Sequence, residues 1–367
     1  MTEFRRFNPG ELVPVSRARG HSAMTKRTLA VALSLLAGTA HAQDKTDPWL
    51  AVDQTLRAAL QEQAVPGMGL AVYDRAGTKV FERMYGDFSP DRRVAIASAS
   101  KLVTGVVLFR LVDEGLLSLD STTGAVLGWR GEKGAITLRH LLSFTSGMQR
   151  EDMCTLLSAL TLAQCVALIE RNDLEAAAGE RFDYGSTHLA VAGRMAEVAT
   201  GARWDQVFAT RLRAPLGLPA DAQYYATPRR PVPTENPLLA GGLRMTMREY
   251  ARVLQLVFDK GRWQGQRLIA AALFDQQAVM PYPRAVIGHS PWPEGRYGLT
   301  AWLECATPQT GCASLSSPGA FGFTPFLDRD AGYYAVLGME IDRADEDNFA
   351  LELERALKPL IAAAVAP

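Results

Sequence analysis

The sequence has 367 residues, of which 48% are hydrophobic and 21% are charged, a composition typical of globular proteins. Lysine and arginine number 39, as do aspartate and glutamate, so the formal net charge is +0. This balance excludes the basic excess that binding to nucleic acid or to an anionic membrane needs, and it favours a small neutral or mixed-charge ligand. The length predicts either one large domain or two lobes that share a core.

The first patterned segment, residues 24–43, is typical of a secretory signal. It has a basic start, an apolar core at residues 29–36 and a small-x-small cleavage site at Ala40-His41-Ala42. The apolar core is too short to span a membrane, so we expect cleavage and no stable membrane insertion. We predict a translation start at Met24, an extension with signal peptide over residues 1–42, and a periplasmic or secreted single domain over 43–367. A disordered cytosolic tail is the alternative.

The first third of the predicted domain contains a helix, a hairpin and a second helix. Leu50, Val52, Leu56 and Leu60 have helical spacing. A hairpin and a helix that is apolar on every side, and therefore buried, follow in the ranges 67–86 and 102–112.

Residues 118–280 read mostly as helices, and strand patterns return only after them. The predicted strands lie in the ranges 297–305, 319–328 and 332–341. A last helix over residues 345–364 is expected to kink or restart at Pro359. Strands at both chain ends around an inserted, mostly helical lobe predict an α+β domain.

Four cysteines, Cys154, Cys165, Cys305 and Cys312, allow three disulfide pairings. Cys305 and Cys312 flank a turn-rich hairpin tip, and Cys154 and Cys165 lie close in one loop-and-helix region. In an oxidising compartment we expect these two short-range pairs to close. Four buried free thiols are the alternative. The spacing contains no C-x-x-C, which argues against a zinc or thioredoxin-like site.

The segment Ile96 to Gly105, I-A-S-A-S-K-L-V-T-G, places Ser98 and Lys101 on one face of a helix start. Unpaired N–H groups and the positive end of the helix dipole favour a developing oxyanion there. For Lys101 to accept a proton near neutral pH, its pKa must fall by ~3 units, which burial against an apolar helix can supply. A helix-capping serine beside a surface lysine is the alternative reading of these two residues.

Two further segments carry polar groups that fit such a site. Tyr184 and Ser186 form a Tyr-x-Ser at a predicted helix start, where a phenol and a hydroxyl both face a cleft. In S-S-P-G-A-F-G-F, Gly319 and Gly322 fall within a predicted strand, where glycine marks the close approach of a ligand or another backbone.

With the segments at residues 136–148 and 240–246, these motifs resemble the serine β-lactamase/penicillin-binding-protein superfamily. The match is to the branch of class C β-lactamases, D-Ala-D-Ala carboxypeptidases and family VIII esterases, and it runs over nearly the whole predicted domain. The resemblance implies a β-lactamase/transpeptidase-like fold, in which an antiparallel sheet from both chain ends is flanked by helices. It implies neither a metal nor an organic cofactor.

The resemblance also implies roles for individual residues. Ser98 corresponds to the acylated nucleophile, Lys101 to its proton partner, and Tyr184 to a second general base or acid whose phenolate Lys101 holds. Ser186 stands where the family usually has asparagine, within expected reach of Lys101 or a substrate carbonyl. Backbone N–H groups of Ser98 and Ala320 are the expected oxyanion hole.

The third motif departs from the family pattern, because Ser317-Pro318-Gly319 replaces Lys-Thr-Gly. The loss of that lysine is expected to weaken the binding of carboxylate-bearing β-lactams and peptidoglycan termini more than that of neutral esters. We therefore favour an esterase among small-molecule ester, amide and β-lactam hydrolases. A β-lactamase or D-Ala-D-Ala carboxypeptidase is the alternative. A non-catalytic penicillin-binding-like sensor or scaffold is an alternative of another class.

Overall fold

The computed structural model describes residues 47–366 apart from residues 64, 308–309 and 342–348. The predicted signal peptide therefore lies outside the described residues. All described residues belong to a single unit. Within them, no helix combines the length and the apolarity needed to cross a membrane.

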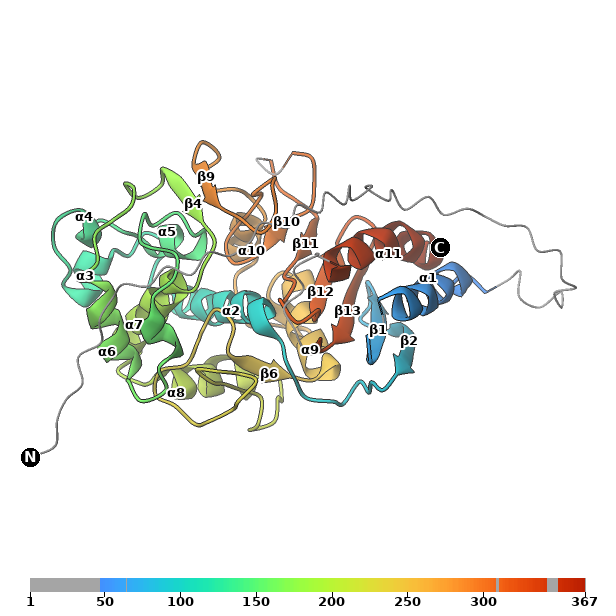
Figure 1. The fold of residues 1–367 in the computed structure, drawn as a ribbon. Coiled ribbons are helices and arrows are strands. Elements are labelled where there is room, and N and C mark those ends of the chain that lie inside the picture. Colours follow the sequence, from blue (N-terminus) through green and yellow to red (C-terminus); the bar gives the residue numbers. More distant parts are fainter. Residues whose placement is uncertain (1–46, 64, 308–309, 342–348, 367) are drawn as a thin grey trace, which may run out of the picture. The chain divides into compact units, whose positions relative to one another are not determined.

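The central element of this unit is a six-stranded antiparallel sheet with the order β10-β11-β12-β13-β1-β2. The pairing of β13 with β1 joins a late part of the sequence to an early one, because Met68 of β1 lies opposite Met339 of β13. This arrangement confirms the predicted sheet built from both chain ends (Figure 1). The strands are β1 (Gly67–Asp74), β2 (Lys79–Gly86), β10 (Trp302–Leu303), β11 (Ser314–Ser316), β12 (Thr324–Asp328) and β13 (Tyr333–Met339).

The two faces of the sheet belong to different cores, as the alternation of side chains along a strand requires. In β13, Tyr333, Ala335 and Leu337 pack with helices α1 (Leu50–Glu62) and α11 (Phe349–Val365). Tyr334 and Val336 point into the larger core, on the side of α9 (Met247–Phe258). Helices therefore flank the sheet on both faces.

Helix α11 does not restart at Pro359, which was one of the two outcomes that we expected there. The helix continues through this residue to Val365. Pro359 is exposed, so water can hydrogen-bond the carbonyl that loses its helical donor.

Helix α2 (Ser100–Asp113) runs through the middle of the unit (Figure 1). Only Arg110, Val112 and Asp113 of its residues are not buried. This burial confirms the helix that the apolar run predicts, and it removes the first turn of α2 from bulk water.

Helices of 4 to 14 residues and small sheets lie around α2, between residues 94 and 289. The exception is α9, which packs on β12 and β13 of the large sheet. The other helices are α3 (Thr123–Leu127), α4 (Gly131–Gly134), α5 (Leu138–Leu142), α6 (Leu162–Ile169), α7 (Thr187–Thr200), α8 (Trp204–Phe208) and α10 (Ala271–Gln277). The small sheets are β3 (Val94–Ala95) with β6 (Leu243–Met245) and β5 (Gln223–Tyr224), β4 (Arg181–Asp183) with β9 (Val286–His289), and β7 (Arg262–Trp263) with β8 (Gln266–Arg267).

Both predicted cysteine pairs are bonded in the structure. Cys154, in a short 3-10 helix, pairs with Cys165 of α6, and Cys305 pairs with Cys312 next to the β10–β11 connection. Their Cα atoms lie 5.2 and 5.8 Å apart. Each bond closes a short loop at the border of a regular element.

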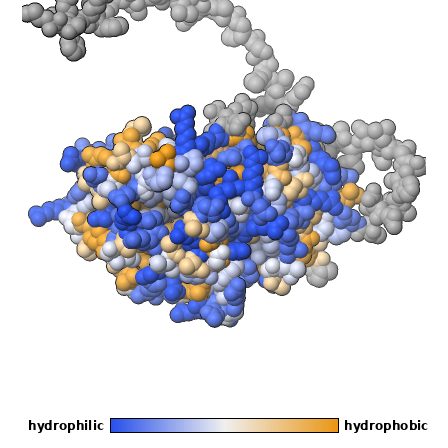
Figure 2. All heavy atoms as spheres, turned by 90° about the horizontal axis from the view of Figure 1, so that it is seen from below, coloured by the Kyte–Doolittle hydropathy of each residue, from blue (hydrophilic) through white to orange (hydrophobic). Residues whose placement is uncertain are grey.

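The surface seen in Figure 2 is mostly hydrophilic, and hydrophobic residues form small separate groups on it. Scattered apolar residues of this kind are normal for a protein surface. Nothing on this face therefore points to a large apolar docking area.

Candidate active site

Ser98 lies in a one-turn 3-10 helix, Ala97–Ala99, between strand β3 and helix α2. The residue before it, Ala97, has a φ of 45°, a left-handed conformation that is uncommon for alanine. Such strain persists only where the surrounding structure enforces it, and it is frequent at functional sites. The turn leaves Ser98 half-buried at the N-terminal end of α2.

Lys101 lies in the first turn of α2 and is 3% exposed. Its Nζ atom is 2.9 Å from Ser98 Oγ and 2.9 Å from the carbonyl oxygen of Ala240. Burial lowers the pKa of Lys101 to about 7, and the negative charge of Glu151 opposes this effect only in part. At neutral pH a large fraction of Lys101 is therefore an uncharged amine within hydrogen-bonding distance of the serine.

Tyr184 follows strand β4 and faces the same two residues. Lys101 Nζ lies 4.5 Å from the centroid of its ring. Burial raises the pKa of Tyr184 above its ordinary value, and interactions with the side chains of Ser98 and Trp302 oppose that rise. The phenol is thus protonated at neutral pH, which corrects the expectation of a phenolate held by Lys101. The physical reason is that the low-dielectric surroundings penalise the phenolate.

Ser186 lies just before helix α7 and lines the same pocket as Ser98. The structure shows no hydrogen bond between Ser186 and Lys101, whose Nζ atom donates to Ser98 and to the carbonyl oxygen of Ala240. A hydrogen bond from Ser186 to a substrate group stays a prediction.

The third motif has a different geometry from the one that we predicted. Strand β11 ends at Ser316 and β12 begins at Thr324, so Gly319 and Gly322 lie in the connecting turn, not in a strand. The Gly322 N–H donates to the Gly319 carbonyl, and Gly322 has a φ of 89°. A strand does not form here because this left-handed turn is favourable only for glycine.

Ser317 is buried, and its hydroxyl is 3.4 Å from the carbonyl oxygen of Ser98, to which it donates. It is not among the residues that line the pocket at Ser98. Substrate binding by the Ser317 side chain stays a prediction, and its contact with the backbone of Ser98 indicates a positioning role. Gly319 lies against the backbone of Ile96, where a Cβ atom would overlap the carbonyl oxygen.

The two backbone groups expected to bind an oxyanion are unpaired. Within the described part of the chain, neither the Ser98 N–H nor the Ala320 N–H donates a hydrogen bond. Ala320 is exposed, and Ser98 is half-buried. Unpaired donors of this kind are suited to charge that develops on a bound carbonyl oxygen.

A pocket of about 530 Å³ opens over Ser98, Lys101 and Tyr184. Its walls are largely apolar, with side chains such as Leu156, Leu238 and Phe321, and its charged residues besides Lys101 are Glu151, Arg229 and Arg230. Such a pocket suits a small ligand with an apolar body and few polar groups.

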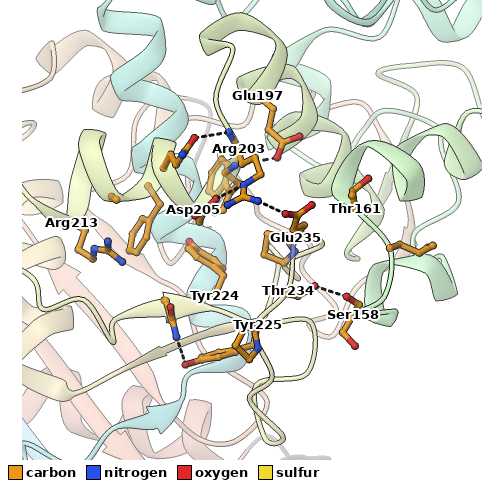
Figure 3. Close-up of a pocket in the computed structure, with 18 of the residues that line it drawn as sticks. Ser158, Thr161, Glu197, Arg203, Asp205, Arg213, Tyr224, Tyr225, Thr234 and Glu235 are labelled. Carbon is orange, nitrogen blue, oxygen red and sulfur yellow. Dashed lines mark hydrogen bonds and ion pairs between the residues drawn. The ribbon is translucent and has the colours of Figure 1, made fainter.

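A larger cavity of about 830 Å³ lies elsewhere and contains none of the predicted site residues (Figure 3). Tyr224 lines it and hydrogen-bonds with Thr104 of α2 at 2.9 Å. Arg203 at its rim pairs with Glu235 and lies 3.4 Å from Asp205. The larger of these two cavities therefore does not coincide with the predicted site residues. Among the described residues, no three His, Cys, Asp or Glu side chains are grouped to hold a metal ion.

Sequence reasoning missed Trp302. This residue lies on β10 opposite Ser316, and its ring centroid is 5.1 Å from that of Tyr184. It is 2% exposed and also contacts Tyr297 in an aromatic cluster behind Tyr184. No local pattern marks Trp302, because only the pairing of β10 with β11 brings it to the site.

Known proteins of this architecture are similar to the chain in sequence and in structure. A family model described as Beta-lactamase matches residues 52–356. The crystal structure of a beta-lactamase candidate from Bacteroides dorei DSM 17855 has a TM-score of 0.74 and 28% identity, and the match covers 85% of this chain and 98% of that one.

Two enzymes give weaker matches. EstCE1, described as a hydrolase with promiscuous acyltransferase activity, has a TM-score of 0.65 and 21% identity over 86% of this chain and 99% of its own, a likeness that shows the fold alone. Monacolin J acid methylbutanoyltransferase from Aspergillus terreus is 26% identical over 211 residues, which cover 47% of this chain and 51% of that protein. The chain thus spans about half the length of this curated relative.

The family model covers most of the chain, and the fold agrees with it from β1 to α11. The finding confirms the resemblance drawn from the motifs. The chain belongs to the beta-lactamase family, which comprises serine hydrolases and acyltransferases.

Proposed function

We propose that this chain is an exported serine hydrolase that cleaves carboxylic esters through an acyl-enzyme at Ser98. The observation that carries the proposal is the pair of Ser98 and buried Lys101, with 2.9 Å between Oγ and Nζ and a lysine pKa of about 7. A serine becomes a nucleophile when an adjacent base accepts its proton, and this geometry meets that requirement.

In the proposed acylation, neutral Lys101 accepts the proton of Ser98, and Oγ attacks the ester carbonyl carbon. The N–H groups of Ser98 and Ala320 stabilise the negative charge on the carbonyl oxygen. As the bond to the leaving alcohol breaks, protonated Tyr184 donates its proton to the alcohol oxygen, and the Lys101 ammonium returns a proton to Tyr184. Water then attacks the acyl-enzyme with the same groups, releasing the acid and restoring Ser98.

Esters are favoured over β-lactams by the surroundings of the nucleophile. Ser317 takes the place of the third-motif lysine and donates to the backbone of Ser98. The pocket walls are largely apolar, which suits a short acyl chain. Export is supported by the signal pattern at residues 24–43 and by two disulfides, which persist in oxidising compartments.

Acyl transfer to an alcohol is a second candidate, in which the alcohol replaces water in the second step. It is supported by the apolar pocket walls and by the similarity to a methylbutanoyltransferase. Adding a primary alcohol to the ester assay tests it, since a transferase forms the new ester faster than the free acid.

The test is turnover of p-nitrophenyl acetate and butyrate and of a chromogenic cephalosporin, with Ser98→Ala as the control. Ester turnover that the variant loses, with little cephalosporin cleavage, is the expected result. Comparable cephalosporin turnover would instead identify a β-lactamase or carboxypeptidase. Labelling of Ser98 by a fluorophosphonate without turnover of either substrate would identify a binder.

A further inference from the structure

The pocket at Ser98 carries an arginine that the proposed chemistry does not use. Arg230 lines the pocket and is exposed. Its guanidinium forms no ion pair or hydrogen bond with any residue that the structure describes. A cation at the edge of a largely apolar pocket is a natural partner for an anionic group on a ligand.

The backbone that carries Arg230 is fixed by a tight turn. The Arg230 N–H donates to the Thr227 carbonyl at 2.9 Å, and the Thr227 hydroxyl donates to the Arg230 carbonyl at 3.1 Å. Arg244 of β6 donates to the carbonyl of Pro228 in the same turn at 2.7 Å. The guanidinium is therefore presented from a rigid base, which lowers the entropic cost of binding.

The neighbouring Arg229 has a structural contact instead. Its guanidinium lies 3.8 Å from the ring centroid of Phe321, and it donates to the carbonyl of Ile341. This contact joins the turn to the loop that carries Ala320. Arg229 therefore helps to shape the pocket mouth, and Arg230 beside it is presented to the ligand.

The other charged groups of the pocket leave Arg230 as the group best suited to bind an anion. Lys101 is largely uncharged above its pKa of about 7, and the third motif supplies Ser317 in place of lysine. Glu151 adds a negative charge, which acts on Lys101 and Tyr184. An anionic substrate group is therefore repelled from the Glu151 side of the pocket and attracted to the Arg230 side.

We propose that Arg230 is a specificity residue that binds a carboxylate carried by the substrate away from the scissile carbonyl. The substrate class is then an ester with one free carboxylate, and Arg230 takes over, from a different loop, the charge that the third motif lacks. This inference rests on the proposed ester hydrolysis at Ser98. It revises the expectation that, without the third-motif lysine, carboxylate-bearing substrates bind less well than neutral esters.

The experiment compares charged and neutral esters in the wild type, Arg230→Gln and Arg230→Lys. Mono-p-nitrophenyl succinate carries its carboxylate on the acyl group, and p-nitrophenyl butyrate is its neutral counterpart. 4-Acetoxybenzoate carries its carboxylate on the leaving group, and phenyl acetate is its neutral counterpart. Arg230→Gln is expected to lower kcat/KM for one of the two carboxylate esters by about tenfold, mainly through KM, because charge-assisted hydrogen bonds are strong. Neutral esters are expected to change less than about twofold, and Arg230→Lys is expected to retain most of the preference.

Arg284→Gln is the matched control, since Arg284 is also exposed, forms no ion pair with described residues and lies outside this pocket. Glu151→Gln is expected to raise turnover of the favoured carboxylate ester. Equal effects of Arg230→Gln on charged and neutral esters, or an equal effect of Arg284→Gln, would overturn the inference while ester hydrolysis stands. No turnover of any ester by the wild type would overturn the proposed function and the inference with it.

Discussion

The pocket at Ser98 and the cavity of Figure 3 differ in how their charged side chains are paired. In the larger cavity, the charged side chains have partners: Arg203 pairs with Glu235, and Glu197 with Arg194 at 2.9 Å. Around Ser98, a lysine is buried without a carboxylate at hydrogen-bonding distance, and two backbone donors are unpaired. The smaller pocket thus contains the groups whose free energy can change when a substrate binds.

This difference indicates that a buried amine without a carboxylate partner marks a candidate reactive site better than volume does. Paired charges at a surface contribute little to the free energy of unfolding. Burying an amine beside a hydroxyl lowers the stability of the folded protein but makes the amine a better base at neutral pH. Lower stability and higher reactivity often occur together at catalytic sites. The following predictions test this contrast.

The largest effect is expected for Lys101→Met. Ester turnover is expected to fall by about 10³-fold or more, because Ser98 loses its base. The variant is nevertheless expected to unfold at a higher temperature than the wild type at pH 7, because methionine removes a buried titratable amine of similar length. Turnover of p-nitrophenyl butyrate measures the loss of activity, and thermal unfolding followed by circular dichroism measures the gain in stability. A variant less stable than the wild type would contradict the idea that burial of the Lys101 amine destabilises the fold.

The titration of Lys101 is expected to change both the catalytic rate and the stability of the protein with pH. Below about pH 7, kcat/KM is expected to fall about tenfold per pH unit as Lys101 becomes charged. Between about 7 and 10.5 the unfolded state binds more protons at Lys101 than the folded state, so this residue makes stability rise with pH. The stability gain of Lys101→Met is therefore expected to shrink across that window, and unfolding at several pH values measures it.

A smaller effect is expected for Trp302→Phe, which keeps a ring behind Tyr184 but removes the indole N–H. We expect kcat to fall by about fivefold, because a neutral hydrogen bond contributes about 1 kcal/mol. The alkaline limb of the kcat profile is expected to move to higher pH, since the interaction with Trp302 lowers the pKa of Tyr184. Trp263→Phe, on β7 and outside the pocket, is the control. An unchanged pH profile would leave Trp302 with a packing role only.

The smallest effect is expected for Arg203→Gln at the larger cavity. The side chains of Arg203 and Glu235 are 54% and 51% exposed, so the pair contributes less than about 1 kcal/mol to the free energy of unfolding. Urea unfolding measures that change, and ester turnover is expected to stay at the wild-type rate. Loss of turnover in Arg203→Gln would remove the contrast between the two regions.

The sequence was most informative where structure depends on neighbours along the chain. The i,i+3 spacing of Ser98 and Lys101, the hairpin at residues 67–86 and both short-range cysteine pairs were predictable because each is a local relation. The family motifs added Tyr184, which no local rule connects to Ser98.

The failures of prediction share a cause. Alternating apolar residues suggested a strand through Gly319 and Gly322, but a left-handed turn interrupts it. Proline was expected to kink or restart the last helix at residue 359, but the helix does not restart there, where the residue is exposed to solvent. In both places a local rule competes with hydrogen bonds and exposure that the surroundings set.

The amino-acid sequence by itself determined the family, the α+β class and the pairing of Ser98 with Lys101, because these depend on local spacing and ordered motifs. Tertiary structure alone decided the lowered pKa of Lys101, the place of Trp302 behind Tyr184 and the presentation of Arg230 at the pocket. Each of these requires segments far apart in the sequence to exclude water from one another or to meet across a sheet. Desolvation and non-local pairing arise only when the core is assembled, so they cannot be predicted from any single stretch of the sequence.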